Sequence, residues 1–493
     1  MEARIDGGLK LKAIRSVKWN ALSAFSSVSI QFLRTLILAR MLDPRDYGLM
    51  GMMMVAMGFA DAFVDAGLGS AIIHRQTEDR KVLSSLFWTN IGLGFAVYGI
   101  LAACIPIMVW YFKEPLLASM SLVLFLSILF RSLGRQFEAI LAKDLRFKQI
   151  ARVDMLSSVH SLDSAILLAW SGYGVWSLVW SQVSKVGIQG VLQLLLNWKD
   201  HRPHWHFRWS DVRPYMGYSL FQLGEINVRY LAQRFDQMIL ARLLGAFVLG
   251  QYNFAYQLVL LPTMRINPIV TRVAFPVFAK LQHDELRLRR LYLRVIHLLS
   301  VANAPILVGT AVFAPFLVPV LFGHKWSDSI PLVQVFAIVS FSRSIGNPMG
   351  SLMLAKGKAN IGFYLNIALL LCNIPSIYLG VKLAGALGAI IALLVVQLIL
   401  QVPVYQLVVR KLIGPCGKDF ILSWLRPVVH ALLAGTIGVV GSYVVFAHFG
   451  NVVRLGAGGA LFVLAYVGLI LWQEPDLLRQ FKDLKKGTSG DLL

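Results

Sequence analysis

The chain has 493 residues, of which 57% are hydrophobic and only 15% are charged. Soluble globular proteins carry about 25% charged residues, so this composition argues against that class. The formal net charge of +22 raises nucleic-acid binding as a function, but the placement of the basic residues along the chain argues against it.

Fourteen apolar blocks occupy most of the chain, and the length of each is close to the roughly 20 residues that a helix needs to cross a bilayer. They are centred near residues 28, 59, 98, 127, 161, 185, 228, 258, 308, 341, 370, 397, 436 and 463. Helices are the spanning structure that fits blocks of this length. The sequence therefore predicts an all-α integral membrane protein with about 14 transmembrane helices. The first block has no evident cleavage site and is expected to remain as a span.

Basic residues collect on one side of the predicted spans. Loops on the same side as the N-terminus hold 31 Lys and Arg residues, and loops on the other side hold 7. Cytoplasmic loops carry such an excess, so we expect both termini to be cytoplasmic. Most of the net charge then sets topology and contacts anionic membrane lipids rather than nucleic acid.

An internal repeat relates the two halves of the chain. The segment Ile37–Leu42 matches Ile239–Leu244 at an offset of 202 residues, and Arg131–Gly134 matches Arg343–Gly346. These matches predict two parallel six-helix repeats followed by two extra helices, an arrangement common in transporters.

The predicted domains follow from the repeat. They are a lobe over 1–197, a cytoplasmic linker over 198–213, a second lobe over 214–412, two extra helices over 413–472 and a cytoplasmic tail over 473–493. The linker is rich in Trp and His, which we interpret as an interfacial aromatic belt rather than a metal site. The tail places its apolar residues on one helical face and is expected to lie on the membrane surface.

Polar side chains recur on one face of the first and seventh predicted spans. The first span carries Asn20, Ser23, Ser27, Gln31 and Arg34. The seventh carries Gln222, Glu225, Arg229, Gln233 and Asp236, within an arc of about 80°. The offset of 202 relates each position in one set to its counterpart in the other. Repeat and helical phase therefore select the same face.

Further polar groups occupy other spans. They are Asp61 and Asp65 in the second, Arg131, Arg135 and Glu138 in the fourth, Asp154, Ser158 and Ser161 in the fifth, and Arg343 and Asn347 in the tenth. Two interpretations stay open. The groups line a wet, cationic cavity, because an arginine at membrane depth needs water or an anion, or they pair between helices in a dry interior. Arg265 lies between two prolines, where helical phase is unreliable.

Motifs for energy conversion and catalysis are missing from the sequence. It contains no phosphate-binding loop of the ATPase type, no nucleophile elbow and no zinc-protease motif. The three cysteines are scattered and make neither a disulfide framework nor a metal set. We expect no cofactor, no metal and no enzymatic activity.

Several short strings together resemble the bacterial polysaccharide-transport family, the lipid-linked oligosaccharide flippases of the multidrug/oligosaccharidyl-lipid/polysaccharide (MATE-like) exporter superfamily. The strings are Leu38-Ala39-Arg40, Asp65-Ala66-Gly67-Leu68, Gly134-Arg135-Gln136-Phe137, Asn267-Pro268-Ile269, Leu321-Phe322-Gly323 and Gly346-Asn347-Pro348. The resemblance is closest to the colanic acid exporter type and covers nearly the whole chain. It implies a V-shaped cavity between two six-helix lobes, with two C-terminal helices outside them.

The resemblance also implies a substrate, an undecaprenyl-pyrophosphate-linked oligosaccharide moved across the bacterial inner membrane for exopolysaccharide, capsule or O-antigen assembly. The cavity residues expected to bind it are Gln31, Arg34, Arg131, Arg135, Arg229, Arg265, Arg343 and Asn347. The acids expected to couple transport to H⁺ or Na⁺, or else to balance the arginines, are Asp61, Asp65, Glu225 and Asp236. Expected partners include a polysaccharide polymerase and co-polymerase.

Three rival functions remain open at this point. One is a cation-coupled drug antiporter of the same superfamily, which would favour an acidic, aromatic pocket. Another is a flippase for the peptidoglycan precursor. The third is a membrane glycosyltransferase or polymerase, which large periplasmic loops would indicate.

Overall fold

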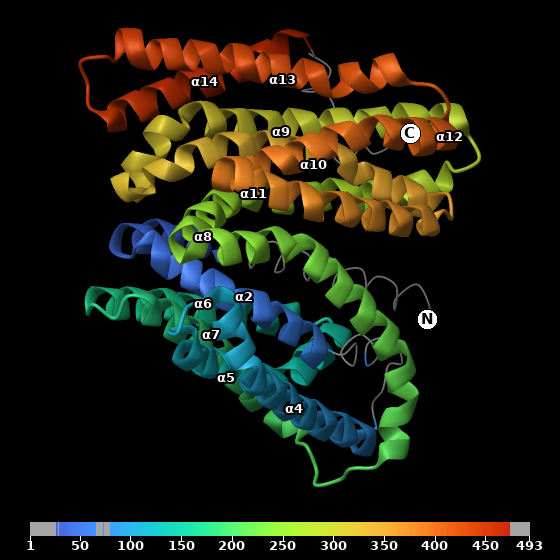
Figure 1. Ribbon diagram of the computed structural model, residues 1–493. Helices are drawn as coiled ribbons and strands as arrows, with labels where there is room; N and C mark the ends of the chain where they lie inside the picture. Colours follow the sequence, from blue (N-terminus) through green and yellow to red (C-terminus); the bar gives the residue numbers. More distant parts are fainter. Residues whose placement is uncertain (1–25, 28, 66–71, 73–78, 474–493) are drawn as a thin grey trace. The chain divides into compact units, whose positions relative to one another are not determined.

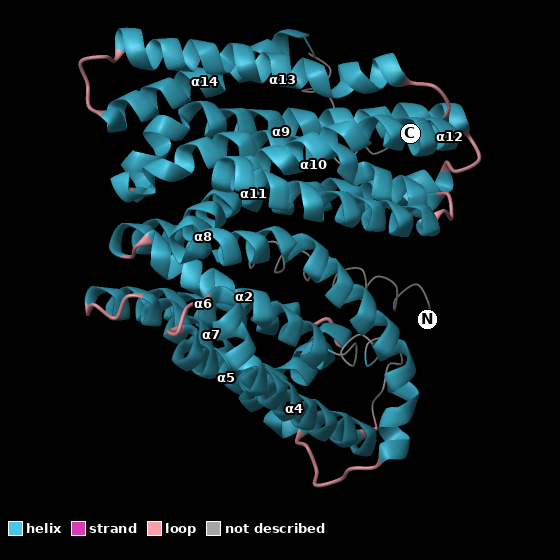
Figure 2. Ribbon diagram, viewed as in Figure 1, coloured by secondary structure: helices cyan, strands magenta, loops and turns pink. Residues whose placement is uncertain are grey.

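The computed structural model describes residues 26–27, 29–65, 72 and 79–473. Throughout these residues the chain forms helices joined by turns and short loops, without strands (Figure 2). The predicted all-helical fold class is therefore confirmed. The chain divides into two compact units, residues 1–250 and 251–493. The lobe boundaries deduced from the repeat stay a prediction.

The first unit consists of helices that run back and forth (Figure 1). It contains a helix over residues 29–41, α2 (Pro44–Asp65), α4 (Arg80–Phe112), α5 (Leu117–Lys143), α6 (Phe147–Trp170), α7 (Val175–His201) and the first part of α8 (Trp209–Lys280). Helix ends carry the expected signals. Asp79 caps α4 by accepting from the backbone N–H of Lys81 at 2.8 Å, and Gly174, with φ of 54°, precedes α7.

The 72 residues of α8 include two predicted blocks. A straight helix of that length would span about 108 Å, several times the thickness of a bilayer core. The helix breaks at Gly245, where φ is 80° and ψ is −176°. Because that conformation strains residues with a Cβ, the glycine is what allows the chain to turn there.

Two glycines related by the repeat offset pack closely within the first unit. A Cβ on Gly48 would overlap the carbonyl oxygen of Ala246, and a Cβ on Gly250 would overlap that of Pro44. Ala246 stands at the repeat position of Pro44, just as Gly250 stands at that of Gly48. The contact is thus symmetric with respect to the repeat, and it requires residues without side chains.

A second close crossing joins α5 to α7. A Cβ on Gly134 would lie 2.7 Å from the Cα of Gly190, which leaves no room for a methyl group. This approach sets the two backbones near van der Waals contact, as small residues do in membrane helices.

The second unit continues from the end of α8. It contains α9 (Glu285–Phe322), η1 (His324–Ser329), α10 (Ile330–Ala355), α11 (Ala359–Val404), η2 (Tyr405–Val409), α12 (Arg410–Ile413), α13 (Gly417–Val440), η3 (Gly441–Val445) and α14 (Asn451–Gln473). Helix α9 packs against α10, α13 and α14. Helix α11 changes direction at Gly385, where φ is 58°.

A buried polar network ties three helices of the second unit together. Asn303 of α9 donates from Nδ2 to Oδ1 of Asn267 at 2.9 Å and to Oγ of Ser344 at 2.8 Å. Ser344 of α10 donates to the same Asn267 oxygen at 3.1 Å. Such hydrogen bonds satisfy groups that would otherwise be costly to bury, and they hold the helices in register.

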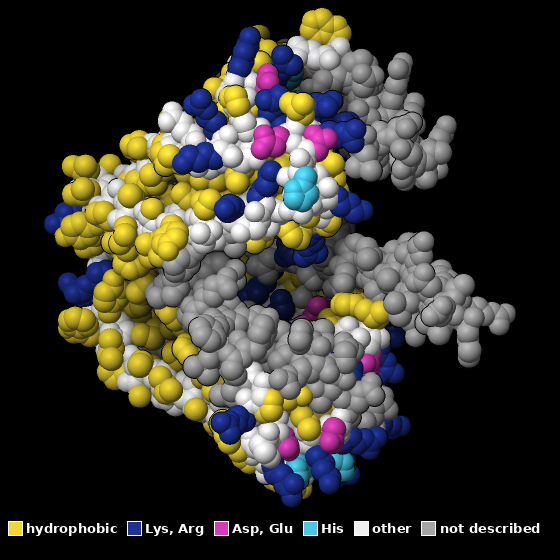
Figure 3. All heavy atoms as spheres, turned by 90° about the vertical axis from the view of Figure 1, so that its right-hand side faces the viewer, with side chains coloured by type: hydrophobic (Ala, Val, Ile, Leu, Met, Phe, Trp, Pro, Cys, Tyr) yellow, Lys and Arg dark blue, Asp and Glu magenta, His cyan; other side chains and the backbone are white. Residues whose placement is uncertain are grey.

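Apolar side chains cover much of the outer surface. Within α4, only 17% of the most apolar 18-residue window is buried inside the protein, and Phe95, Ile107 and Trp110 are all more than 60% exposed. In Figure 3, hydrophobic side chains cover broad areas of the face shown, with Lys and Arg side chains gathered beside them. An apolar surface of this extent is stable in lipid, so the protein is a multi-pass membrane protein.

Eight helical stretches among the described residues are long and apolar enough to cross a membrane. Helices α6 and α7 are not among them, although they have 24 and 27 residues. Polar residues such as Asp154, Asp163 and Lys185 lower their apolar character. The count of 14 spans stays a prediction.

Candidate functional site

Charged side chains from several helices meet inside the first unit. Arg34, on the helix over residues 29–41, donates from Nη2 to Oγ of Ser181 on α7 at 2.8 Å. Ser181 is fully buried, so this bond holds the guanidinium against α7. Arg34 makes no ion pair with any residue that the structure describes.

Two other arginines do have acidic partners. Nε of Arg131 lies 3.3 Å from Oδ1 of Asp61, an ion pair between α5 and α2. Nη1 of Arg135 donates to Oε2 of Glu138 at 3.1 Å, one turn further along α5. Removing one member of such a pair would take an opposite charge away from the other at membrane depth, which is costly.

A lysine and an aspartate complete the cluster. Lys185 of α7 is partly exposed and lies near enough to Arg34, Arg131 and Asp154 for electrostatic interaction. Within the described part of the chain it makes no hydrogen bond or ion pair. Asp154 of α6 accepts a hydrogen bond from Nε2 of Gln189 at 2.8 Å, and that bond orients its carboxylate.

Among the described side chains, the charges of this cluster leave cations in excess. Asp61 offsets Arg131 and Glu138 offsets Arg135, which leaves Asp154 near Lys185, while Arg34 contacts no described carboxylate. Arg34 and Lys185 repel each other across a low-dielectric interior. An anion that entered this region would find two cations whose mutual repulsion it relieves, with hydroxyl and amide groups beside them.

The remaining predicted residues lie in different environments. Gln31 is partly exposed, one turn before Arg34. In the second unit, Arg343 and Asn347 of α10 and Arg265 of α8 are exposed. The structure therefore brings together Arg34, Arg131, Arg135 and Asp61 within one unit. Whether Arg265, Arg343 and Asn347 join them stays a prediction.

The structure does not describe the side chains of some predicted residues. They are Asp65, Glu225 and Arg229, together with the polar residues of the first span before residue 26. The expected interfacial helix of the tail also lies outside the described residues. Asp236 is described and is only 7% exposed, and its Oδ1 accepts the backbone N–H of Gln237 at 2.8 Å.

Sequence reasoning missed the contribution of α7. Ser181, Lys185 and Gln189 follow one another at intervals of four residues, so they share one helical face. A charged residue flanked in this way in a predicted span is a sufficient signal. The structure adds what spacing cannot give, namely that this face meets Arg34 and Asp154.

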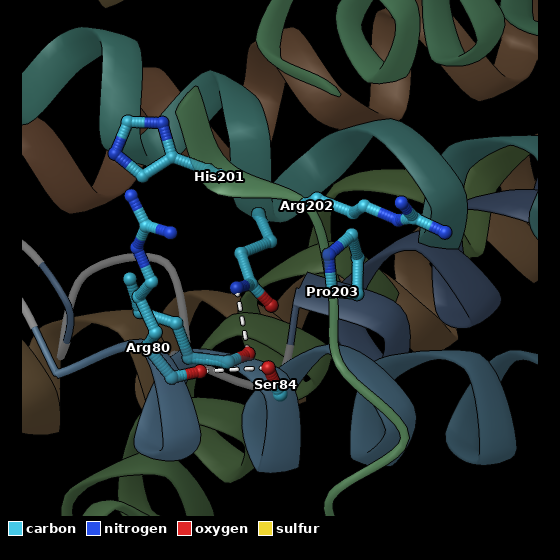
Figure 4. Close-up of a pocket in the computed structure, with 7 residues that line it drawn as sticks. Arg80, Ser84, His201, Arg202 and Pro203 are labelled. Carbon is cyan, nitrogen blue, oxygen red and sulfur yellow. Dashed lines mark hydrogen bonds between the residues drawn. The ribbon is translucent and has the colours of Figure 1, made fainter. Parts of the chain in front are cut away.

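A small pocket lies away from this cluster, where the linker passes the start of α4. Its lining includes Arg80, Ser84, His201 and Arg202. Figure 4 shows Arg80 and His201 pointing toward each other, while Arg202 points away. None of the predicted site residues lines it.

The linker itself is bonded to α4. The backbone N–H of His204 donates to Oγ of Ser84 at 3.0 Å, and Nε1 of Trp88 donates to the carbonyl of His204 at 2.9 Å. Trp88 also stacks on Trp205, with ring centroids 4.6 Å apart. These contacts hold the linker against α4, so the pocket lies at the contact between the linker and this helix.

Comparison with known proteins decides the family. The sequence profile of the family described as polysaccharide biosynthesis protein matches residues 37–331. The chain belongs to this family. Among curated relatives, this chain is 31% identical over 422 residues to the lipopolysaccharide biosynthesis protein WzxC of Escherichia coli K12, covering 85% of each chain. It is 24% identical to the succinoglycan biosynthesis transport protein ExoT of Rhizobium meliloti 1021, over 96% of this chain and 95% of the relative.

A solved structure shares the fold of this polysaccharide biosynthesis protein. It is the lipid II flippase MurJ in an inward closed conformation, with a TM-score of 0.74 and 13% sequence identity. The match covers 93% of this chain and 99% of the other. The fold class predicted from the repeat and the apolar blocks is confirmed by this likeness.

Proposed function

We propose that this protein is a flippase that moves an undecaprenyl-pyrophosphate-linked oligosaccharide from the cytoplasmic to the periplasmic leaflet of the bacterial inner membrane. It acts by binding and conformational change, without covalent catalysis. The exported unit then enters exopolysaccharide, capsule or O-antigen assembly, where a polymerase and co-polymerase act on it.

The observation that carries this proposal is the excess of cations among the described charged side chains of this cluster. Among the described residues, Arg34 is held by Ser181 and not by a carboxylate. A partly buried cation without a described counter-ion is costly at membrane depth, and an anionic ligand at this site best explains its presence. A guanidinium offers planar donors that suit phosphate oxygens.

The chemistry of the substrate matches this arrangement. A pyrophosphate-linked sugar cannot cross hydrocarbon unaided, because its charges and hydroxyls would lose their water. Arginines can hold the pyrophosphate, and the serine, asparagine and glutamine side chains can bond sugar hydroxyls. The polyprenyl chain stays in the lipid throughout.

Family membership supports the same proposal. The relatives WzxC and ExoT are named for lipopolysaccharide biosynthesis and for succinoglycan biosynthesis transport. A membrane protein in such a pathway that lacks catalytic motifs fits the step that moves an intermediate across the bilayer. We further propose that Asp61, Asp65, Glu225 or Asp236 couples this movement to H⁺ or Na⁺.

The proposal can be tested in the source organism. Deleting the gene should cause lipid-linked oligosaccharide to accumulate with its sugar facing the cytoplasm, and should stop surface polysaccharide production. Spheroplasts treated with a membrane-impermeant periodate reagent report which face carries the sugar. Surface polysaccharide at the parental level after deletion contradicts the proposal.

The drug antiporter alternative requires a separate measurement. A cation-coupled antiporter would extrude ethidium from cells that overproduce it. We expect ethidium efflux equal to that of cells with an empty vector, because Arg34 and Lys185 disfavour cationic ligands. Efflux that depends on the ion gradient would favour the antiporter.

A further inference from the structure

The cations of the first unit fall into two kinds. Arg131 and Arg135 each contact a carboxylate, at 3.3 Å and 3.1 Å respectively. Arg34 and Lys185 have no such contact among the described residues. Paired arginines are already neutralised, so a ligand gains more from the two that are not.

Helix α7 places those two cations side by side. Ser181 and Lys185 are one turn apart, and Ser181 Oγ accepts from Nη2 of Arg34. The bond positions Arg34 beside Lys185 while using only one of the donors of its guanidinium. No described residue occupies the other donors or the ammonium group of Lys185, so both can serve a ligand.

Asp154 lies near Lys185, the lysine of this pair, but does not form an ion pair with it. Its Oδ1 accepts from Gln189, the residue one turn beyond Lys185 on α7. Asp154 acts electrostatically on Lys185, yet the two form no ion pair within 4.0 Å. The carboxylate therefore lowers the cost of an ammonium group at this depth without forming an ion pair with it.

We propose that Arg34 and Lys185 form the pyrophosphate-binding pair of the substrate site, and that Asp154 is the internal counter-ion with which the pyrophosphate competes. This inference rests on the proposed function and names the residues that bind the pyrophosphate of the substrate. A group with two adjacent phosphates suits two adjacent cations, whereas an ordinary phospholipid presents a single phosphate.

The competition gives Asp154 a distinctive signature. A residue that only supports the fold, or that binds the ligand itself, would weaken binding when changed. A competing carboxylate would do the opposite, because its removal leaves Lys185 less well compensated until the ligand arrives. Asp154→Asn keeps an oxygen that can accept from Gln189, so local geometry is preserved.

The test measures binding of undecaprenyl pyrophosphate to the purified full-length protein in nanodiscs of zwitterionic lipid. Phosphatidylglycerol serves as the second titrant, since it carries one phosphate. We expect Lys185→Gln to weaken binding of undecaprenyl pyrophosphate by about tenfold or more, the loss typical of a charge-assisted hydrogen bond. Lys185→Arg should retain most of the affinity.

The matched control is Lys199→Gln, the same change in the exposed last turn of α7. It should leave affinity within about twofold of the parent. Asp154→Asn should bind about threefold more tightly or better, by removal of the competing charge. Thermal unfolding without ligand shows whether each variant is folded. Should Lys185→Gln fail to fold, Asp154→Asn still decides the inference.

Three outcomes would overturn the inference. They are parental affinity in Lys185→Gln, parental or weaker affinity in Asp154→Asn, and displacement of the pyrophosphate lipid by an equal amount of phosphatidylglycerol. Failure of the proposed function looks different. In that case the unmodified protein itself would show no preference for undecaprenyl pyrophosphate and would not move it across a bilayer.

Discussion

Gly250 packs directly on the backbone of Gly48, so that a Cβ on Gly250 would lie 3.1 Å from the amide nitrogen of Gly48. The two glycines are separated by 202 residues, the offset that relates the two repeats. Each also faces the carbonyl of the residue that precedes the other by four, Pro44 or Ala246. Repeat-related positions thus make a reciprocal contact within the first unit.

This contact predicts the effect of adding a methyl group. Gly48→Ala and Gly250→Ala should each destabilise the protein by about 1–3 kcal/mol, because a carbonyl of the facing segment cannot move away cheaply. Gly99 of α4 has open space around it, so Gly99→Ala is the control and should be neutral or stabilising by up to about 1 kcal/mol. Thermal unfolding in detergent measures all three. Equal stability of Gly48→Ala and Gly99→Ala would show that the contact is not tight.

Arg34 should be essential for export. Arg34→Ala removes both the charge and the bond to Ser181, and we expect it to abolish surface polysaccharide while the protein stays in the membrane at parental abundance. Arg34→Lys keeps the charge but loses the planar fork, so partial export is expected. Immunoblots of membranes supply the abundance control. Full export by the alanine variant would contradict an anion site at this position.

The ion pair between Arg131 and Asp61 leads to a different expectation. Arg131→Ala should stop export and also lower abundance, because Asp61 loses the opposite charge of Arg131 at membrane depth. Adding Asp61→Asn removes that negative charge and should restore abundance. Export by the double variant then reports whether Arg131 also serves the substrate. If abundance does not recover in the double variant, loss of this ion pair is not the reason for the lower abundance of Arg131→Ala.

Topology is testable apart from the site. The bias of 31 to 7 basic residues predicts that both termini are cytoplasmic. Alkaline phosphatase is active only in the periplasm. Green fluorescent protein becomes fluorescent in the cytoplasm but not after export in an unfolded state. Fused after Leu493, the first should be inactive and the second fluorescent. The reverse pattern would refute the predicted orientation.

Apolar blocks and the repeat predicted the fold class because both depend on the sequence alone. Block length reports bilayer thickness, and strings such as Leu38-Ala39-Arg40 recur at a fixed offset as Leu240-Ala241-Arg242. The number of spans was harder to predict from the sequence. Charged residues such as Asp154 and Lys185 weaken the apolar signal of α6 and α7.

The site was predictable in part. Helical phase placed Gln31 and Arg34 on one face, and the structure joins Arg34 to α7. Phase within one helix does not reveal which neighbouring helix it meets. The pairings of Arg131 with Asp61 and of Asp154 with Gln189 depend on crossings such as that of Gly134 with Gly190, which only the packed structure shows.

The central claim is that the protein moves a pyrophosphate-linked oligosaccharide across a bilayer, and reconstitution tests it most directly. Purified protein is placed in liposomes that hold undecaprenyl-pyrophosphate-linked oligosaccharide from the source organism, with an imposed H⁺ or Na⁺ gradient. A membrane-impermeant lectin or periodate then measures sugar arriving at the outer leaflet. The account predicts transfer much faster than in protein-free liposomes, and its loss in Arg34→Ala. Transfer no faster than in protein-free liposomes, under either gradient and with folded protein, would contradict it.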